Sequence, residues 1–171
     1  FKSINIILFC CGMNIRSKFN DIDINDFKNV LNTNFISAFK FYKKIFPLIR
    51  NKKIISRIIN FTSIFSEKTF EERTSYATSK AALKMLTKNL ALEWVKYNTT
   101  VNCISPGPFL TEINKPVLKN KKNYKVFCEK IPLNRFGNID EIISSVLYLS
   151  SDFSSYITGS EIIVDGGWTI K

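Results

Sequence analysis

Isoleucine-rich runs alternate with longer segments of helical periodicity along this chain, and this alternation restricts the possible folds more than any other feature. Four apolar runs have the length and composition of buried strands. They are residues 4–9, 54–61, 100–104 and 160–164. Between them, apolar side chains recur at helical spacing, which predicts helices over residues 26–49, 76–97 and 140–149. The sequence therefore predicts an α/β fold in which helices flank a mostly parallel sheet.

Polar residues at the expected helix starts are candidates for N-caps. We expect Asp23 or Asn25 to cap the first helix, Thr74 or Ser75 the second, and Asp140 the third. The segment between the second strand and the second helix is predicted to be a loop. Residues 109–130 are polar and basic, and two interpretations stay open for them, namely short helices or a mobile flap.

Length and composition are those of a soluble, single globular domain. The 171 residues are 45% hydrophobic and 23% charged, which argues against disorder. The longest apolar runs, such as residues 6–9, are far too short to span a bilayer. The chain contains no histidine, which excludes a Ser-His-Asp triad and a histidine-containing zinc site. Any acid–base chemistry must therefore use Tyr, Lys, Asp, Glu or Cys.

The net charge of +11 suggests a nucleic acid partner at first sight. The lysines are scattered rather than gathered in one stripe, however, and the abundance of Lys, Asn, Ile and Phe is typical of an AT-rich coding sequence. We therefore expect no nucleic acid and no membrane partner. The cysteines, Cys10, Cys11, Cys103 and Cys128, form no Cys-x-x-Cys pair. We expect them to be reduced thiols in a cytoplasmic protein.

A tyrosine and a lysine at the start of the second predicted helix have the spacing needed for proton transfer. Tyr76 and Lys80 are four residues apart and share one helix face. An ammonium close to a phenol favours the phenolate, so Lys80 is expected to lower the pKa of Tyr76. Such a tyrosine can exchange a proton with an alcohol or a ketone. The pair alone is weak evidence, but Ser63 ends the preceding strand, and ligands bind at strand ends in open α/β sheets.

Taken together, the motifs of the chain resemble the short-chain dehydrogenase/reductase family, and in the family's order. Residues 6–12 resemble the family's fourth strand with its terminal Gly, and residues 32–35 resemble the helix segment with the active-site Asn. The Ser63 strand end, Tyr76-x-x-x-Lys80, the turn at residues 105–107 and the closing segment at 157–167 complete the match. The resemblance implies a Rossmann-type fold and hydride transfer between NAD or NADP and a small alcohol or carbonyl compound.

The resemblance also implies a role for each matching residue. Tyr76 would be the acid–base residue, Lys80 would hold the nicotinamide ribose, and Ser63 would polarise the substrate oxygen. Asn34 would hold a water that links Lys80 to solvent. The cofactor-binding positions implied are Gly12, Tyr76, Lys80, Pro106, Gly107, Phe109 and Thr111. No metal site is implied.

Two features depart from the family pattern. Phe9, Cys10 and Cys11 stand where the family usually has Asn-Asn-Ala, so a hydrogen-bonding amide is replaced. In addition, the chain contains no glycine-rich phosphate loop, which would belong to the family's first strands. We therefore expect residues 1–171 to be a single partial Rossmann-type domain, the catalytic half of a longer enzyme, that binds NADH poorly by itself.

Two other functions remain as alternatives. A 3-oxoacyl carrier-protein reductase of fatty-acid synthesis would suit the basic segment 109–130, because the carrier protein is acidic. A degenerate, non-catalytic relative that acts as a binding or structural subunit is the second alternative. Residues 109–116 resemble sugar- or polyol-type members more than a fatty-acid reductase.

Surplus apolar residues on the first two helices predict self-association. One stripe of each helix must pack on the sheet, and a second stripe would then face water in a monomer. The family resemblance implies pairing through the same two helices, so we expect a homodimer or homotetramer. The side chains expected to face outward are Phe41, Ile45, Met85 and Leu92.

Overall fold

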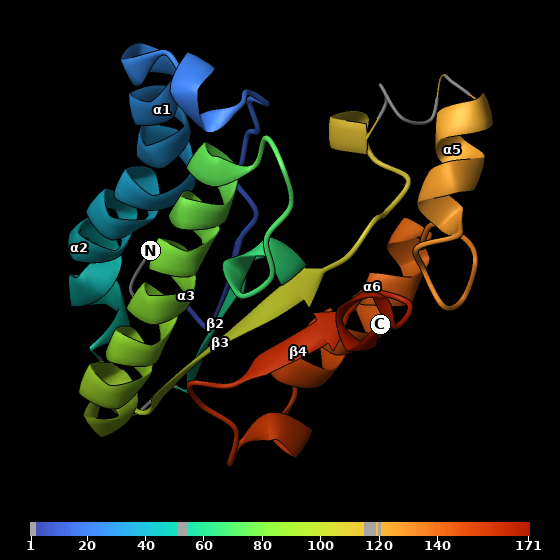
Figure 1. Ribbon diagram of the computed structural model, residues 1–171. Helices are drawn as coiled ribbons and strands as arrows, with labels where there is room; N and C mark the ends of the chain where they lie inside the picture. The colour runs from blue at the N-terminus through green and yellow to red at the C-terminus, as the bar shows by residue number, and fades with distance from the viewer. Residues whose placement is uncertain (1–2, 51–54, 115–118, 120) are drawn as a thin grey trace.

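The computed structural model describes residues 3–50, 55–114, 119 and 121–171, and its centre is a parallel sheet (Figure 1). The strands lie side by side in chain order, β1 to β4, and every neighbouring pair is parallel. The predicted mostly parallel α/β fold is confirmed. Ile54, at the predicted start of the second strand, lies outside the described residues. The strands are β1 (Ile6–Phe9), β2 (Ser56–Phe61), β3 (Thr99–Pro106) and β4 (Glu161–Val164).

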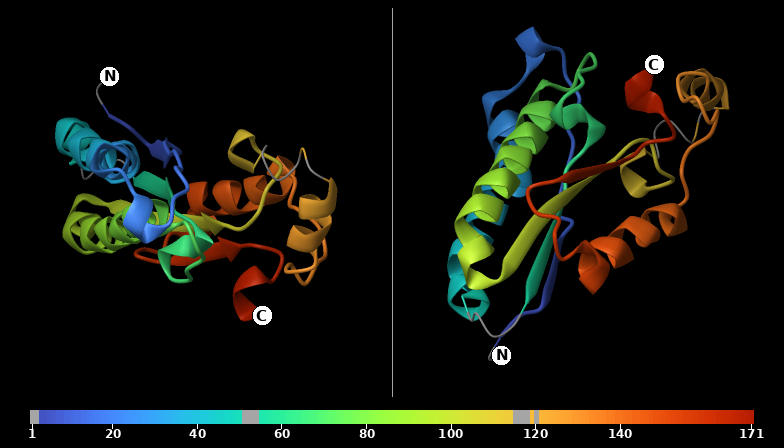
Figure 2. Two further views of the ribbon diagram at one scale, coloured as in Figure 1. Left: turned by 45° about the horizontal axis from the view of Figure 1, so that its top comes forward. Right: turned by 90° about the horizontal axis from the view of Figure 1, so that it is seen from below.

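Helices cover both faces of the sheet (Figure 2). One face carries α1 (Ile24–Leu31), α2 (Ser37–Ile49) and α3 (Thr74–Trp94), and α6 (Ile139–Ser150) packs on the other face. Because both faces are covered, β2 is buried along nearly its whole length. The basic segment contains α5 (Lys121–Cys128), so part of it is a short helix. Lys115 and Pro116 of that segment lie outside the described residues.

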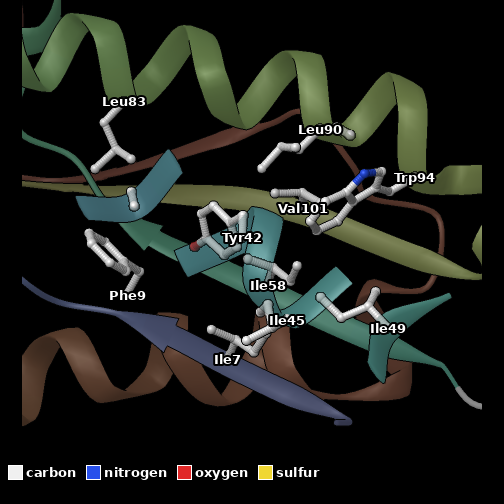
Figure 3. Close-up of a cluster of buried hydrophobic side chains, with 12 residues drawn as sticks. Ile7, Phe9, Tyr42, Ile45, Ile49, Ile58, Leu83, Leu90, Trp94 and Val101 are labelled. Atoms are coloured by element: carbon white, nitrogen blue, oxygen red, sulfur yellow. The ribbon is translucent and has the colours of Figure 1, made fainter. Parts of the chain in front are cut away.

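Alternate residues of the central strand enter two different hydrophobic clusters. Ile58 packs with α2 and α3, whereas its neighbour Ile59 packs with Ile142 and Leu149 of α6. Aromatic rings fill much of the first cluster (Figure 3), where Tyr42 meets the edge of Trp94 with 6.0 Å between ring centroids. These two cores fix the helices against the sheet and therefore set the positions of the strand ends.

The predicted helix starts are partly correct. The Asp23 carboxylate caps α1, accepting from the N–H groups of Asn25 at 2.8 Å and Asp26 at 3.2 Å. The prediction for α3 is wrong, because Arg73 occupies its N-cap position and makes no side-chain capping bond. The prediction for α6 is also wrong, because Asn138 occupies the N-cap position.

A capping box explains the start of α6. The Glu141 carboxylate accepts from the backbone N–H of Asn138 at 2.8 Å, and this places the first turn two residues before Asp140. The long helix predicted over residues 26–49 also has an interruption. A π-helical turn at Asn32–Ile36 separates α1 from α2, and it carries the buried Asn34.

Of the four apolar side chains expected to face outward, three do so. Phe41 is 39% exposed, Met85 57% and Leu92 78%. Ile45 was predicted wrongly, because it is 9% exposed and packs in the cluster with Ile49 and Trp94. Within the described ranges, no helix combines the length and the apolar character needed to cross a membrane.

Candidate active site

A pocket of about 260 Å³ opens where the carboxyl ends of β1, β2 and β3 meet the start of α3. The arrowheads of the strands in Figure 1 mark this edge of the sheet. The structure brings together at this pocket all of the predicted site residues except Asn34, which is buried beneath it. Those lining the pocket are Gly12, Ser63, Tyr76, Lys80, Pro106, Gly107, Phe109 and Thr111.

Ser63 and Tyr76 both line the pocket, and their hydroxyl groups are hydrogen-bonded to each other. Ser63 follows β2 and caps a short 3-10 turn, where its hydroxyl accepts from the Phe65 N–H at 3.2 Å. Tyr76 lies in the first turn of α3. Burial raises the pKa of the Tyr76 hydroxyl above its usual value, whereas its hydrogen bond with Ser63 and the charge of Arg73 act to lower it. A buried, protonated phenol beside a second hydroxyl can donate to a substrate oxygen.

Lys80 is directed to the end of β2 rather than to the tyrosine hydroxyl. Its ammonium donates to the backbone carbonyl of Phe61 at 2.7 Å, and it lies 5.8 Å from the centre of the Tyr76 ring. Burial lowers the pKa of Lys80 from 10.5 to about 8, although Cys10 and Cys11 oppose this change. The expectation that Lys80 lowers the Tyr76 pKa therefore stays a prediction. Arg73 is a cation that acts to lower it.

Gly12 leaves space beside the lysine. A side chain at this position would place its Cβ 3.2 Å from Nζ of Lys80 and 3.8 Å from Oδ1 of Asn34. Any larger residue would therefore press on the ammonium. The absence of a side chain lets the turn after β1 pass close to Lys80 and keeps the ammonium accessible from the pocket.

Asn34 acts as a bracket between the turn after β1 and helix α3. Its amide accepts from the Met13 N–H at 2.8 Å and donates to the Met13 carbonyl at 2.9 Å. It also donates to the Ser79 hydroxyl at 2.9 Å, which in turn donates to the Tyr76 carbonyl at 2.7 Å. This fully buried amide fixes Gly12 relative to Tyr76 and Lys80. The other role expected for Asn34, to hold a water that links Lys80 to solvent, stays a prediction.

The turn after β3 is held by close backbone packing. The Gly107 N–H donates to the Val164 carbonyl at 2.9 Å, and a Cβ at Gly107 would lie 2.6 Å from Cα of Asp165. The Phe109 carbonyl accepts from the Thr111 N–H and from the Asn114 amide, both at 2.9 Å. These bonds fold residues 107–114 over the pocket and place the Thr111 hydroxyl on its wall.

The pocket lining includes residues that the sequence reasoning missed, and the most informative of them are Asn14, Arg73, Phe127 and Trp168. The Asn14 Oδ1 is buried and has no partner among the described residues. Phe127 of α5 and Trp168 pack together with their rings 5.1 Å apart and form an apolar wall. For Arg73 there was a signal, since a cation at a helix N-terminus opposes the helix dipole and is unusual without a reason.

The residues that depart from the family pattern, Phe9 to Cys11, lie in two different environments, the hydrophobic core and the pocket. Phe9 is buried and packs against the rings of Phe41 and Tyr42, with centroids 6.2 and 6.0 Å away. Its side chain therefore takes part in the hydrophobic core. Cys10 lines the pocket, and Cys11 is exposed. All four cysteines are free thiols, as expected.

Comparison with known proteins agrees with this geometry. A family model described as enoyl-(acyl carrier protein) reductase matches residues 1–169. A tropinone reductase homologue of Arabidopsis thaliana is 32% identical over 168 residues, which are 98% of this chain and 63% of that protein. A 2-dehydro-3-deoxy-D-gluconate 5-dehydrogenase of Formosa agariphila is 32% identical over 96% of this chain and 62% of its own length. The chain thus spans somewhat less than two thirds of these relatives.

Solved structures match over nearly the whole chain. A gluconate 5-dehydrogenase from Burkholderia cenocepacia, in complex with NADP and tartrate, superposes with a TM-score of 0.94 at 27% identity, covering 99% of this chain and 66% of that one. A 4-hydroxyisoleucine dehydrogenase complexed with NADH gives a TM-score of 0.93 at 32% identity, covering 98% and 69%. The fold is the Rossmann-type α/β fold of these solved structures. The chain belongs to the short-chain dehydrogenase/reductase family.

Proposed function

We propose that the protein carrying this chain is an NAD- or NADP-dependent oxidoreductase that acts on a small alcohol or carbonyl compound. The observation that carries this proposal is the meeting of Ser63, Tyr76 and Lys80 in one pocket at the carboxyl edge of a parallel sheet. Relatives crystallised with NADP or NADH support the choice of cofactor.

The residues around the pocket fit a nicotinamide group. Gly12 leaves room beside the Lys80 ammonium, Gly107 lets the turn after β3 pack closely on the Asp165 backbone, and the buried Asn14 Oδ1 is free to accept a hydrogen bond. Lys80 would hold the ribose hydroxyls. The backbone at Pro106, Gly107 and Phe109, together with the Thr111 hydroxyl, would hold the carboxamide.

The reaction needs one proton for each hydride. The bound cofactor supplies or accepts the hydride at the substrate carbon. In reduction, the Tyr76 hydroxyl donates its proton to the carbonyl oxygen, while the Ser63 hydroxyl donates a hydrogen bond to the same oxygen. In oxidation, Tyr76 takes the proton from the alcohol. Burial keeps Tyr76 protonated, and Ser63 and Arg73 stabilise its anion once the proton has left. During the reaction, the hydrogen bonds of Asn34 to Met13 and Ser79 hold the turn that follows β1 in a fixed position relative to helix α3.

Several relatives act on sugar acids, and this supports a small polar substrate. Their names include gluconate 5-dehydrogenase and 5-keto-D-gluconate 5-reductase.

A second candidate is an acyl carrier protein reductase, which the description of the matching family model favours. The exposed lysines near α5, Lys119, Lys125 and Lys130, would suit an acidic carrier. We also place the protein in the cytoplasm and expect a homodimer or homotetramer.

The test uses the complete protein that contains this chain. NADH and NADPH carrying deuterium at the transferred position are incubated with keto-sugars, keto acids and a 3-oxoacyl thioester, and products are analysed by mass spectrometry. Deuterium on the carbinol carbon of one product class supports the proposal and selects between the two candidates. Cofactor binding without any transfer would instead favour the non-catalytic alternative.

A further inference from the structure

Arg73 is a buried cation whose Nε has no hydrogen-bond partner within the described part of the chain. The residue is only 6% exposed, and its Nε is buried without a hydrogen-bond acceptor. None of the ion pairs found among the described residues includes it. Its guanidinium carbon lies 5.5 Å from the centre of the Phe65 ring. A buried charge without a partner is unfavourable, and such groups are frequent where a ligand completes the pairing.

The wall of the pocket is positively charged around this residue. Arg73 and Lys80 both line it, and no Asp or Glu does so among the described residues. Burial lowers the pKa of Arg73 to about 10, and the exposed Arg16 also lowers it, whereas Tyr76 and the exposed Glu72 oppose this change. Arg73 is the N-cap residue of α3 and makes no side-chain capping bond, so the positive end of the helix adds to the same potential. An anion entering the pocket would gain from all of these positive charges.

We propose that Arg73 binds a carboxylate of the substrate, so that the enzyme acts on small hydroxy acids or keto acids. This inference rests on the proposed oxidoreductase function and narrows its substrate class. The guanidinium can donate two parallel hydrogen bonds to a carboxylate, and it lies over the Phe65 ring. Arg73 precedes Tyr76 by one helical turn, a Cβ separation of roughly 5–6 Å. The carboxylate and the reacting carbon should therefore be only a few bonds apart.

A phosphate of the cofactor is the other anion that an arginine could bind. The residues around Arg73 favour a carboxylate of the substrate over a phosphate of the cofactor as the bound anion. It contacts Phe65, and its charge acts on Tyr76, so it lies on the side of the pocket where Ser63 and Tyr76 would hold the substrate oxygen. The positions expected for the nicotinamide, around Gly12 and Thr111, belong to other segments of the wall.

The experiment compares matched substrates in the complete enzyme. Each of a panel of small hydroxy acids is paired with the alcohol in which CH₂OH replaces the carboxylate, and kcat/KM is measured for both. We expect the preferred acid to exceed its neutral partner at least tenfold. Arg73→Met should lower the ratio of kcat/KM for the acid to kcat/KM for its neutral partner by about 10- to 100-fold, because the loss of the charge that stabilises the Tyr76 anion acts on both substrates alike. The Kd of NAD(P)H should stay close to that of wild type. Arg73→Lys keeps the charge but not the paired donors, so its preference for the acid should lie between those of wild type and Arg73→Met.

Arg50→Met is the matched control, because Arg50 is exposed at the far end of α2, before β2 begins. It should leave the acid preference unchanged, and thermal unfolding checks that all variants fold. Two results would overturn the inference: no acid that exceeds its neutral partner, or an Arg73→Met variant that loses NAD(P)H affinity instead of acid selectivity. If no compound is turned over at all, the proposed function fails. Calorimetric binding of the same acids to wild type and Arg73→Met then tests the carboxylate site separately.

Discussion

The ammonium of Lys80 donates to the backbone carbonyl of Phe61, 2.7 Å away, and so joins the middle of the catalytic face of α3 to the end of β2. This contact takes the ammonium out of water, and its pKa falls from 10.5 to about 8 because of burial. The lysine is therefore close to its titration point under mildly alkaline conditions.

A pH dependence of stability follows from this depressed pKa. Between pH 8 and 10.5 the unfolded chain binds more protons at Lys80 than the native chain does, so the free energy of unfolding rises with pH. The contribution should be about 3 kcal/mol across this window. The raised pKa of Tyr76 acts in the opposite direction at higher pH, so a difference measurement is needed.

The difference is taken between wild type and Lys80→Met in denaturant titrations at several pH values. The wild-type curve should rise relative to the variant between pH 8 and 10.5. Lys88→Met removes an exposed lysine two turns further along α3 and serves as the control, with a curve parallel to wild type. Parallel curves for Lys80→Met as well would show that the ammonium is not desolvated.

Asn34 is expected to matter for both stability and activity. Asn34→Ala leaves the Met13 N–H and carbonyl without partners, which should lower the free energy of unfolding by about 2 kcal/mol or more. Asn102→Ala is a matched control, because Asn102 makes a similar buried bracket, to Ile157 and Ser160, away from the pocket. Both variants should lose stability, but only Asn34→Ala should lose turnover well below its melting temperature. Equal turnover in the two would argue against a positioning role.

Glycine substitutions should separate stability from cofactor binding. Gly107→Ala forces a Cβ to within 2.6 Å of the Asp165 backbone and should cost about 1–3 kcal/mol of stability. Gly12→Ala meets only the flexible end of Lys80 and should unfold near the wild-type midpoint. It should nevertheless weaken NAD(P)H binding, as measured by fluorescence titration. The reverse pattern would mean that the turn after β1 does not border the cofactor.

The exposed apolar residues of α2 and α3 support self-association in solution. Met85 and Leu92 are 57% and 78% exposed on α3, and Phe41 of α2 is 39% exposed. Light scattering of the complete protein should give the mass of a dimer or tetramer, and Met85→Glu with Leu92→Glu should reduce that mass while the circular dichroism spectrum stays the same. A monomer mass for the wild type at micromolar concentration would refute this expectation.

The sequence predicted the layers of the fold well, because each strand and helix carries its own periodic signal. The ends of helices were less predictable. Asn138 with Glu141 outcompeted Asp140 as the start of α6, and the π-helical turn around Asn34 leaves no trace in apolar spacing. The buried Ile45 was assigned to the wrong face because that turn rotates α2 relative to a continuous helix.

The candidate site was predictable where chemistry depends on spacing along the chain. Tyr76 and Lys80 lie on one helix, and Ser63 ends a strand that leads to it. The electrostatics depend on burial and on contacts between distant segments, which the sequence does not reveal. Lys80 therefore turned out to bind the Phe61 carbonyl, and Arg73 is a cation that acts on Tyr76.

The most direct test of the whole account is the removal of one oxygen atom from Tyr76. In the complete protein, Tyr76→Phe should lower kcat by about 10²- to 10⁴-fold, because the proton donor is lost. The Kd of NAD(P)H should stay close to that of wild type. Tyr97→Phe, a matched change where the ring packs against Phe46 away from the pocket, should retain full turnover. A Tyr76→Phe variant that keeps kcat within a few-fold of wild type would contradict the assignment of Tyr76 as the acid–base residue.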